Sequence, residues 1–474
     1  MKGGSLLWFD YETFGLDAAR DRPVQFASLR TNENLDPISD PSVTYCQPPR
    51  DYIPNPESCL ITGISPAYAL QKGLPEADFM AGILDQFMVP GTCGVGYNSI
   101  RFDDEVTRNA LYRNLYDPFA REWRNGNSRW DILNTMRCAR ALRPEGLNWP
   151  VDSDGRPTLR LDHLTVANGI SHENAHDALA DVMATLALAR KLKESQPRLY
   201  EYMWNLRHKR SVAALADLGS MTPFVMVAGR FPVESCNAAI VVALAKMPTN
   251  PNALIVYDLR HDPESWVKGG KTAEDGEVSP FGLLHINRAP AISPMNSLRE
   301  EDRQRLSLDL DLHQEHLANL RQLEYWQAPA YRALYDRPGF VQSEDPDLGL
   351  YAGFASESDR HRLDEYRDPT SNGFLKLPPH FDSPKFHELC FRYKARNFPD
   401  RLTFEEKDKW DQFCRVKWYE KGHGTLTVEE FGERIAQLRH SGESALGKRE
   451  ILNQVEAYVR SLTQDATGAR NQGE

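Results

Sequence analysis

The sequence has few cysteines, and none of them forms a closely spaced pair. There are seven, an odd number without a Cys-x-x-Cys motif, at positions 46, 59, 93, 138, 236, 390 and 414. This pattern argues against both a disulfide framework and a cysteine-ligated zinc site. We therefore expect reduced thiols and a cytoplasmic protein.

The sequence also lacks long apolar runs and an excess of positive charge. No apolar stretch approaches the roughly 20 residues that span a bilayer, and Asp10 interrupts the short apolar run near the N-terminus, so we expect neither a membrane span nor a signal peptide. The net charge is −11, so binding to nucleic acid would require locally concentrated positive charge. A chain of 474 residues with this ordinary globular composition favours about three domains.

Strand-like and helix-like patterns alternate over residues 1–196. Predicted strands cover 6–10, 24–30, 43–46 and 93–97, and predicted helices cover 76–88 and 102–116. Short strands mixed with helices indicate an α/β domain with a mixed sheet. Further along, β-type runs at 224–227, 239–244, 253–257 and 283–286 predict a small β-barrel or sandwich, and helical patterns return after about residue 345.

Two carboxylates stand at the end of the first predicted strand. Because side chains alternate along an extended chain, Asp10 and Glu12 point to the same side, roughly 7 Å apart. Two such groups at the end of a buried strand repel each other and resist ionisation, and a divalent cation between them would remove both costs. The alternative is that both lie in a solvated loop just past the strand.

Two further acidic clusters follow. Asp103, Asp104 and Glu105 open a predicted helix, where the helix dipole favours acids, so capping alone would explain one or two of them. Asp177 and Asp181 are i,i+4 neighbours, and their repulsion costs a few tenths of a kcal/mol unless a cation or the helix dipole offsets it.

Two basic side chains accompany the third cluster. His176 could take a proton from an attacking water, although a lone histidine is more often structural. Arg160 could hold a substrate phosphate or pair with a nearby acid.

Arginines and aromatic residues are concentrated between residues 101 and 143. This stretch has nine arginines, no lysine and six acids, so it is locally positive within an acidic protein. Arginines suit phosphate oxygens and aromatic faces suit unstacked bases, which is how proteins bind single strands without reading sequence. The alternative is a helical pair whose arginines face water and whose aromatic residues are core.

Three separated segments that each carry carboxylates are what two-metal phosphoryl chemistry needs. The order Asp-x-Glu, Asp, His-x-x-x-x-Asp resembles the DEDDh exonuclease superfamily. Longer segments resemble, within it, the bacterial exonuclease I family: residues 10–15, 22–27, 96–106, 142–150 and 174–178. The resemblance is strongest over 1–200 and weaker beyond, where residues 392–399 are its clearest part.

This resemblance implies a fold and an activity. The fold is an RNase H-like exonuclease domain over 1–196, an SH3-like β domain over 197–345 and a C-terminal α-helical domain over 346–474, which close into a C-shaped clamp. The activity is Mg²⁺-dependent 3′→5′ degradation of single-stranded DNA to 5′-mononucleotides, in DNA repair and recombination. The resemblance also implies binding to the C-terminal tail of single-stranded DNA-binding protein, and we expect a monomer.

The family's functional residues carry over onto this sequence position by position. Asp10, Glu12 and Asp181 would hold two Mg²⁺ ions, with Mn²⁺ as a possible substitute, and Asp103 would complete the acidic set. His176 would be the general base, and Glu12 and Arg160 would contact the substrate. The implied contacts to the single strand are Arg108, Phe119, Trp123 and Arg137.

Two other functions compete with this one. A 3′→5′ exoribonuclease of the same superfamily would have the same acidic site, because discrimination at the 2′-hydroxyl leaves no signal in these residues. A non-catalytic clamp on single strands would show affinity without turnover, and it would leave five correctly ordered catalytic-type residues without a purpose.

Overall fold

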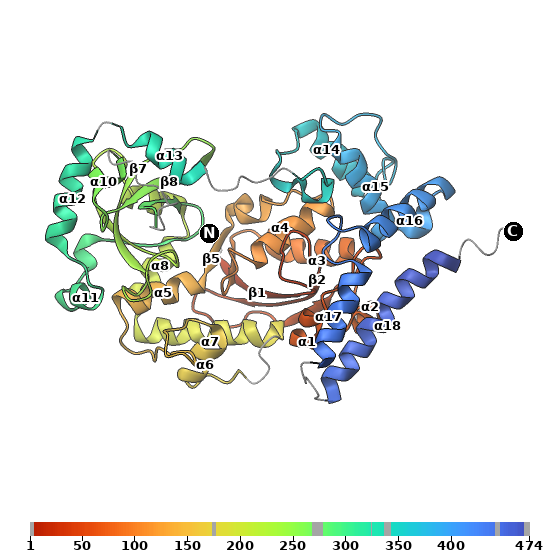
Figure 1. Cartoon of the computed structure of the whole chain (residues 1–474), viewed down its shortest axis with the longest axis horizontal. Helices are drawn as coiled ribbons and strands as arrows, with labels where there is room; N and C mark the ends of the chain where they lie inside the picture. The colour runs from red at the N-terminus through yellow and green to blue at the C-terminus, as the bar shows by residue number, and fades with distance from the viewer. Residues whose placement is uncertain are drawn as a thin grey trace.

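The computed structural model describes residues 4–172, 177–267, 278–323, 325–335, 343–440 and 446–468. Figure 1 shows three parts: a central sheet with helices on both sides, a second β-rich lobe, and a set of helices that leads to the C-terminus. This is the predicted α/β multi-domain architecture.

The central sheet has five strands in the order β3-β2-β1-β4-β5. They are β1 (Ser5–Thr13), β2 (Pro23–Thr31), β3 (Ser42–Tyr45), β4 (Thr92–Gly96) and β5 (Ser128–Asp131). The β1–β2 and β2–β3 pairs are antiparallel, whereas β1–β4 and β4–β5 are parallel. The prediction of a mixed sheet is therefore confirmed.

Helices cover both faces of this sheet. Figure 1 shows α3 (Glu76–Met88) and α4 (Asp103–Arg113) on one side and α7 (Ala178–Ser195) on the other. The other helices of this part are α1 (Pro56–Thr62), α2 (Pro66–Lys72), η1 (Ala120–Glu122), η2 (Arg124–Gly126), α5 (Ile132–Leu142) and α6 (Leu161–Ala167).

The apolar side chains of β1 alternate between these two layers. Leu7 and Phe9 pack in a core with Phe79 and Phe87 of α3, whereas Trp8 belongs to the core that contains Val182 of α7. By the same alternation, the even-numbered residues further along β1 face α7. The strand extends past the predicted residues 6–10 as far as Thr13, which keeps those later positions within the sheet.

The second sheet is antiparallel throughout, in the order β10-β6-β7-β8-β9. Its strands are β6 (Phe224–Val227), β7 (Ala238–Met247), β8 (Asn250–Asp258), β9 (Phe281–His285) and β10 (Ala291–Pro294). Helices in this part are α8 (Pro197–Asn205), α9 (Lys209–Leu215), α10 (Pro263–Val267), η4 (Met295–Ser297), α11 (Glu300–Arg305), α12 (Leu310–Gln322) and α13 (Gln327–Tyr335).

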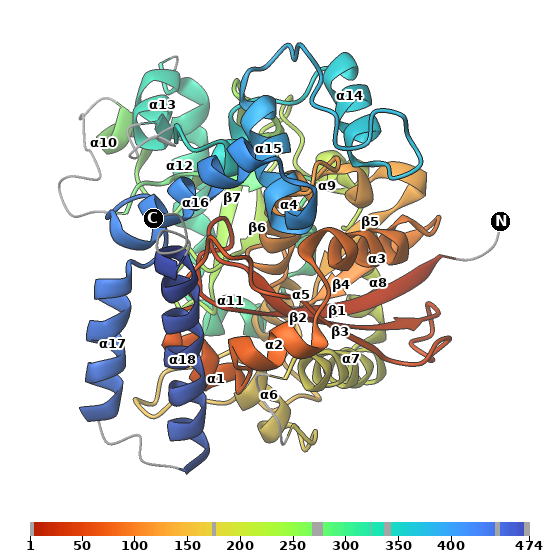
Figure 2. The ribbon, with the colours of Figure 1, turned by 90° about the vertical axis from the view of Figure 1, so that its right-hand side faces the viewer.

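The C-terminal part is helical, as predicted. It comprises η5 (Pro346–Tyr351), α14 (Glu357–Arg367), α15 (Lys385–Asn397), η6 (Pro399–Arg401), α16 (Phe404–Tyr419), α17 (Val428–His440) and α18 (Leu446–Gly468). The last two helices run side by side next to α1 and α2 (Figure 2). Trp410, Trp418 and Val455 share a core with Phe14 and Tyr52, so this part is packed onto the central domain.

Within the described residues, no helix has both the length and the apolar character that a bilayer span requires. All seven cysteines carry free thiols.

Candidate active site

Three carboxylates meet where β1 and α7 approach each other. Asp10, Glu12 and Asp181 each have a carboxylate oxygen, and these oxygens lie within 4.8 Å of one another. Asp10 and Glu12 are paired with β2 inside the sheet, opposite Ala27 and Gln25. The alternative of a solvated loop beyond the strand is therefore wrong, and the two acids point together toward the start of α7.

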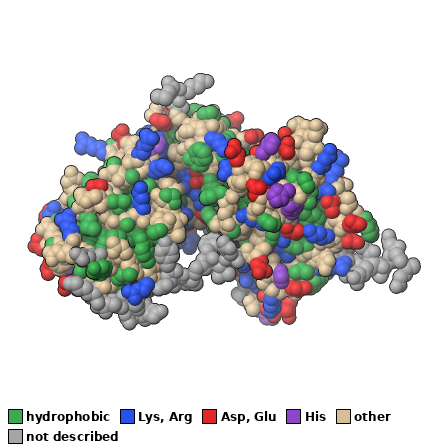
Figure 3. All heavy atoms as spheres, turned by 90° about the horizontal axis from the view of Figure 1, so that it is seen from above, with side chains coloured by type: hydrophobic (Ala, Val, Ile, Leu, Met, Phe, Trp, Pro, Cys, Tyr) green, Lys and Arg blue, Asp and Glu red, His purple; other side chains and the backbone are tan. Residues whose placement is uncertain are grey.

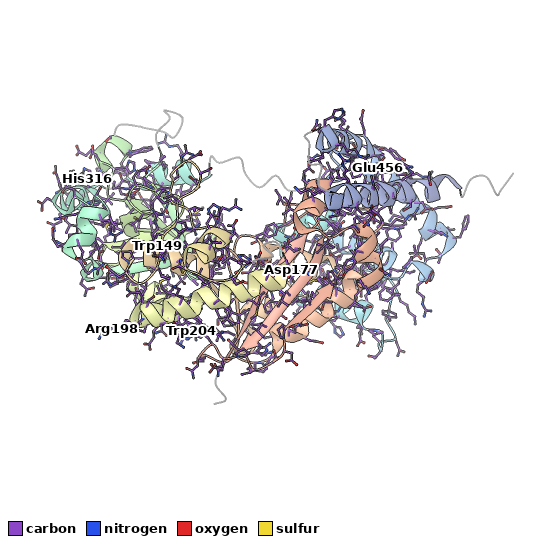
Figure 4. All side chains as sticks on the ribbon, turned by 90° about the horizontal axis from the view of Figure 1, so that it is seen from below. Trp149, Asp177, Arg198, Trp204, His316 and Glu456 are labelled. Atoms are coloured by element: carbon purple, nitrogen blue, oxygen red, sulfur yellow. The ribbon has the colours of Figure 1, made fainter. Side chains whose placement is uncertain are left out.

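The start of α7 is held against the sheet by Asp177. Its Oδ1 accepts hydrogen bonds from the backbone N–H groups of Leu179 and Ala180, both at 3.1 Å. Gln25 of β2 joins this end of the helix from the sheet side, because its Nε2 donates to Asp177 Oδ2 (3.3 Å) and its Oε1 accepts from the N–H of Ala178 (3.1 Å). Figure 4 shows Asp177 at the point where α7 meets the sheet. This cap places Asp181, one turn later, over β1.

Asp103 brings a fourth carboxylate from the opposite layer. It is buried at the start of α4, and its Oδ1 accepts a hydrogen bond from the backbone N–H of Tyr11 (3.1 Å), between Asp10 and Glu12. Its charge contributes to the raised pKa of both those acids. The structure thus brings together all four acids that the sequence singled out.

The three acids at the start of α4 have different partners. None of them caps the helix, because no side chain accepts a hydrogen bond from its free N–H groups. Burial would raise the pKa of Asp104, but ion pairs with Arg121 (2.6 Å) and Arg129 (2.7 Å) hold it below its usual range. Glu105 pairs with Arg108 (2.5 Å). Asp103 therefore faces the site while its two neighbours anchor the helix.

Three of these acids, Asp10, Glu12 and Asp103, resist ionisation in the protein alone. Burial first, and then the charges of Asp181 and Asp103, raise the pKa of Glu12 to about 9. Burial likewise raises the pKa of Asp103 to about 8, and it combines with the surrounding carboxylates to raise the pKa of Asp10 well above its ordinary value. A divalent cation would remove this cost, and clustered carboxylate oxygens are the ligands that hard cations prefer. The donor set therefore fits a divalent metal ion.

A cavity of about 480 Å³ opens beside Asp181. Arg137 and Arg160 both lie on its wall, with Tyr97 and Asn98. The Arg160 side chain is exposed and its Nη2 lies 2.9 Å from Asp162 Oδ2, so the pairing with a nearby acid that the sequence left open does form. Because Arg160 also lines the cavity, its contact with the substrate stays a prediction.

His176 lies outside the described residues. A different histidine, His172, reaches the acidic cluster, with its Nε2 2.5 Å from Asp181 Oδ1. Sequence reasoning missed this contact because the two residues are nine positions apart, on either side of the start of α7, so helical periodicity gives no signal for it.

The arginine-rich stretch is mostly neutralised inside the protein. Arg113 pairs with Glu76 at 2.9 Å, and Arg108 makes a two-pronged pair with Glu122 at 2.6 and 2.9 Å. With Arg121 and Arg129, these are four buried arginines with acidic partners. They fit neither the exposed phosphate-binding surface nor the solvent-facing alternative, because a buried arginine is tolerated only when it is paired.

The aromatic residues of the same stretch include two at the surface. Trp123 is 62% exposed, and Phe119, which is half-buried, lines a cavity of about 370 Å³. Phe354, from the C-terminal part, stacks edge-on against Phe119 with 5.6 Å between ring centroids. The Arg108 guanidinium lies over the face of the Phe119 ring, with its central carbon 5.2 Å from the ring centroid. Exposed aromatic faces suit base stacking, and the four predicted strand contacts stay predictions.

Seen from above, a hollow divides the surface into two lobes (Figure 3). The lobe with the second sheet lies on one side, and the central domain with the C-terminal helices lies on the other (Figures 1 and 3).

Three family models match consecutive stretches of the chain. They are described as "Exonuclease" over residues 7–189, "Exonuclease I SH3-like domain" over 207–337 and "Exonuclease I C-terminal domain" over 344–462. Exodeoxyribonuclease I of Escherichia coli is 42% identical over 86% of this chain and 88% of its own. The Haemophilus influenzae enzyme of the same name is 39% identical over 97% of this chain and 98% of its own.

Solved structures of the same family superpose on the whole chain. Exonuclease I from Methylocaldum szegediense has a TM-score of 0.90 and 44% identity, covering 97% of this chain and 99% of its own. The E. coli enzyme in complex with a dA16 oligonucleotide has a TM-score of 0.90 and 39% identity, covering 97% and 100%. Another E. coli structure is described as a zinc-bound complex with single-stranded DNA, and a further structure is described as SSB/exonuclease I with an inhibitor.

These matches confirm the resemblance that the sequence motifs indicated, with its three-part fold and its use of divalent metal. The chain belongs to the exonuclease I family and is a hydrolytic exodeoxyribonuclease.

Proposed function

We propose that this exodeoxyribonuclease removes 5′-mononucleotides one at a time from the 3′ end of single-stranded DNA, with two divalent ions at its acidic site. The observation that carries the proposal is the convergence of Asp10, Glu12 and Asp181 within 4.8 Å, backed by Asp103 from the opposite layer. A non-catalytic clamp would have no use for an acidic cluster in which burial and mutual repulsion raise the pKa of Asp10 and Glu12.

The four acidic residues bind the ions or orient the strand that carries the ligands. Asp10, Glu12 and Asp181 hold the ions, and Asp103 orients β1 through the N–H of Tyr11. The bound ions supply charge stabilisation for the attacking and leaving oxygens of the phosphodiester. Mg²⁺ is the proposed ion because it prefers hard carboxylate ligands, and Mn²⁺ is expected to substitute for it.

The remaining roles concern the substrate and the proton. His176 takes the proton from the attacking water, as the motif implies. Arg160 and Glu12 contact the terminal nucleotide, and the position of Arg160 on the wall of the 480 Å³ cavity supports this role. Trp123 and Phe119 stack bases further along the strand, and Arg108 and Arg137 contact its backbone. Arg108 also lies against the Phe119 ring.

The single-strand preference is supported by the relatives solved with dA16 and with single-stranded DNA. A solved structure of SSB/exonuclease I supports an interaction between this chain and the tail of a single-stranded DNA-binding protein. We also propose a monomer, a cytoplasmic location, a role in DNA repair and recombination, and domain boundaries after residues 196 and 345.

A comparison of three substrates tests the proposal. Matched single-stranded DNA, single-stranded RNA and blunt duplex DNA are incubated with the enzyme and saturating Mg²⁺, and released mononucleotides are measured. We expect release from single-stranded DNA alone. Release from RNA at a similar rate would keep the acidic site but replace the substrate with that of an exoribonuclease.

A further inference from the structure

His172 connects the acidic site to α6 through two hydrogen bonds. Its imidazole is almost fully buried, with 2% of the side chain exposed. Nε2 lies 2.5 Å from Asp181 Oδ1, and Nδ1 lies 3.2 Å from Thr165 Oγ1. Thr165 is buried on α6, where its hydroxyl also lies 2.9 Å from the carbonyl oxygens of Leu161 and Asp162. The ring is therefore fixed at both nitrogens.

The direction of these hydrogen bonds follows from the groups involved. An ionised carboxylate only accepts, so Nε2 carries the proton that it shares with Asp181. Nδ1 of a neutral ring then accepts, and the Thr165 hydroxyl has one proton, which it can share between Nδ1 and the carbonyl oxygens of Leu161 and Asp162. A buried donor at Nε2 fixes the orientation of the Asp181 carboxylate, which could otherwise rotate about its side-chain torsions.

We propose that His172 is a positioning residue that orients Asp181 for the divalent ion, and that Thr165 holds His172 in place. The inference rests on the proposed role of Asp181 as a metal ligand. Groups that hydrogen-bond to a ligand from behind commonly set its orientation, and their loss typically lowers metal affinity by about 10–100-fold. The arrangement also joins the acidic site to the helix that follows Arg160, the predicted substrate contact.

Direct Mn²⁺ binding to the full-length protein without DNA tests the inference. Free Mn²⁺ is measured by electron paramagnetic resonance during a titration at constant pH. His172→Ala is expected to weaken Mn²⁺ binding by about 10–100-fold. His172→Gln keeps an amide donor near the position of Nε2 and should restore most of the affinity. His163→Ala is the matched control, because His163 lies on α6 like Thr165 but contacts Asp162, at 4.0 Å, instead of Asp181.

Turnover as a function of metal concentration separates positioning from proton transfer. In His172→Ala the Mn²⁺ concentration for half-maximal rate should rise by the same factor as the dissociation constant, while kcat at saturating Mn²⁺ approaches that of the unmodified enzyme. A kcat that stays low at saturating metal would contradict a positioning role. If His172→Ala does not fold, Thr165→Val supplies the test, with a smaller loss of affinity in the same direction.

Two results would overturn the inference. Unchanged Mn²⁺ affinity in His172→Ala would show that Asp181 needs no such support, and tighter binding would show that His172 competes with the ion for the carboxylate. Asp10→Asn distinguishes these results from a failure of the proposed site: if it too binds Mn²⁺ normally, the metal site itself is misplaced, whereas loss in Asp10→Asn alone rejects only the role of His172.

Discussion

Asp10 is half-buried and Glu12 is buried at the end of a strand, where neither can ionise easily without a cation. Their position follows from strand alternation, which puts both on the α7 face of β1, and from the capped start of α7, which adds Asp181. Asp103 lies next to these acids because its carboxylate accepts a hydrogen bond from the backbone N–H of Tyr11. At the scale of single residues, the site is therefore a concentration of negative charge whose cost a divalent ion offsets.

The first prediction concerns the metal ligands. Asp181→Ala should lower kcat by more than the roughly 10–100-fold that loss of a supporting residue costs, because it removes a direct ligand. Affinity for single-stranded DNA, measured by fluorescence anisotropy, should change little because the strand contacts lie elsewhere. Equal losses in turnover and in binding would mean that Asp181 supports the fold rather than the chemistry.

The second prediction concerns pH in the absence of metal. The pKa of Glu12 is raised from 4.5 to about 9, so the folded protein binds a proton that the unfolded chain releases. The stability from this proton is fully present below about pH 4.5 and is lost as pH rises toward 9. In EDTA, the Tm of Glu12→Gln relative to the unmodified protein should therefore increase between pH 5 and pH 9. A difference in Tm that does not vary with pH would contradict the raised pKa.

At the scale of elements, one cap determines where α7 begins. Asp177 accepts hydrogen bonds from two backbone N–H groups of α7 and from the side chain of Gln25. It therefore fixes both the residue at which the helix begins and the position of the helix against β2. The i,i+4 relation between Asp177 and Asp181 predicted from the sequence thus joins a structural residue to a functional one.

The third prediction follows from this cap. Asp177→Ala should lower the free energy of unfolding by about 1 kcal/mol, because helix N-caps contribute about 0.5–2 kcal/mol. It should also lower kcat, because the first turn of α7 carries Asp181. Asp177→Asn keeps a side-chain acceptor and should retain most of the stability in urea unfolding. If Asp177→Ala were as stable as the unmodified protein, the cap would not determine the start of α7.

Elements with strong local patterns were predictable from the sequence, and those defined by distant partners were not. The predicted helix over 76–88 and strand over 224–227 coincide with α3 and β6. The short strands β5 (Ser-Arg-Trp-Asp) and β10 (Ala-Ile-Ser-Pro) were missed, because polar residues and a proline interrupt the apolar run that marks the equally short β6. The predicted strand at residues 6–10 was shorter than β1, because the charged residues Asp10 and Glu12 interrupt the apolar pattern although the strand continues to Thr13.

The same distinction applies to the candidate site. The four acids were found from their type and order, because a cluster of carboxylates is unusual in each local context. The acidic partners of the arginines were not predicted. Glu76 lies far from Arg113 in the sequence, and an ion pair between distant residues produces no periodic pattern in the sequence. The contact between His172 and Asp181 was missed for the same reason.

At the scale of the whole molecule, buried ion pairs fasten the C-terminal helices to the central domain. Arg396 of α15 makes a two-pronged pair with Asp51 at 3.0 and 2.8 Å and also contacts Asp347. Lys417 of α16 reaches the same Asp51 carboxylate at 3.0 Å. Burial alone would raise the pKa of Asp51, but Arg396 and Lys417 lower it well below its ordinary value.

The fourth prediction concerns this junction. Asp51→Ala leaves Arg396, Lys417 and Arg22 without their shared partner and should lower the free energy of unfolding by about 3–5 kcal/mol. Urea unfolding measures the loss. Glu429→Ala removes an exposed partner of Lys421 and should change stability by less than about 1 kcal/mol. Similar effects of the two substitutions would show that the C-terminal helices are held by their apolar core alone.

The central claim is that the acidic site removes nucleotides from the 3′ end of single-stranded DNA only with a divalent ion. A time course on 5′-labelled single-stranded DNA, first in EDTA and then after addition of Mg²⁺, tests it most directly. We predict intact substrate in EDTA and, after Mg²⁺, a ladder of labelled products that shortens progressively. Shortening in EDTA, or immediate release of labelled mononucleotide from the 5′ end, would contradict the account.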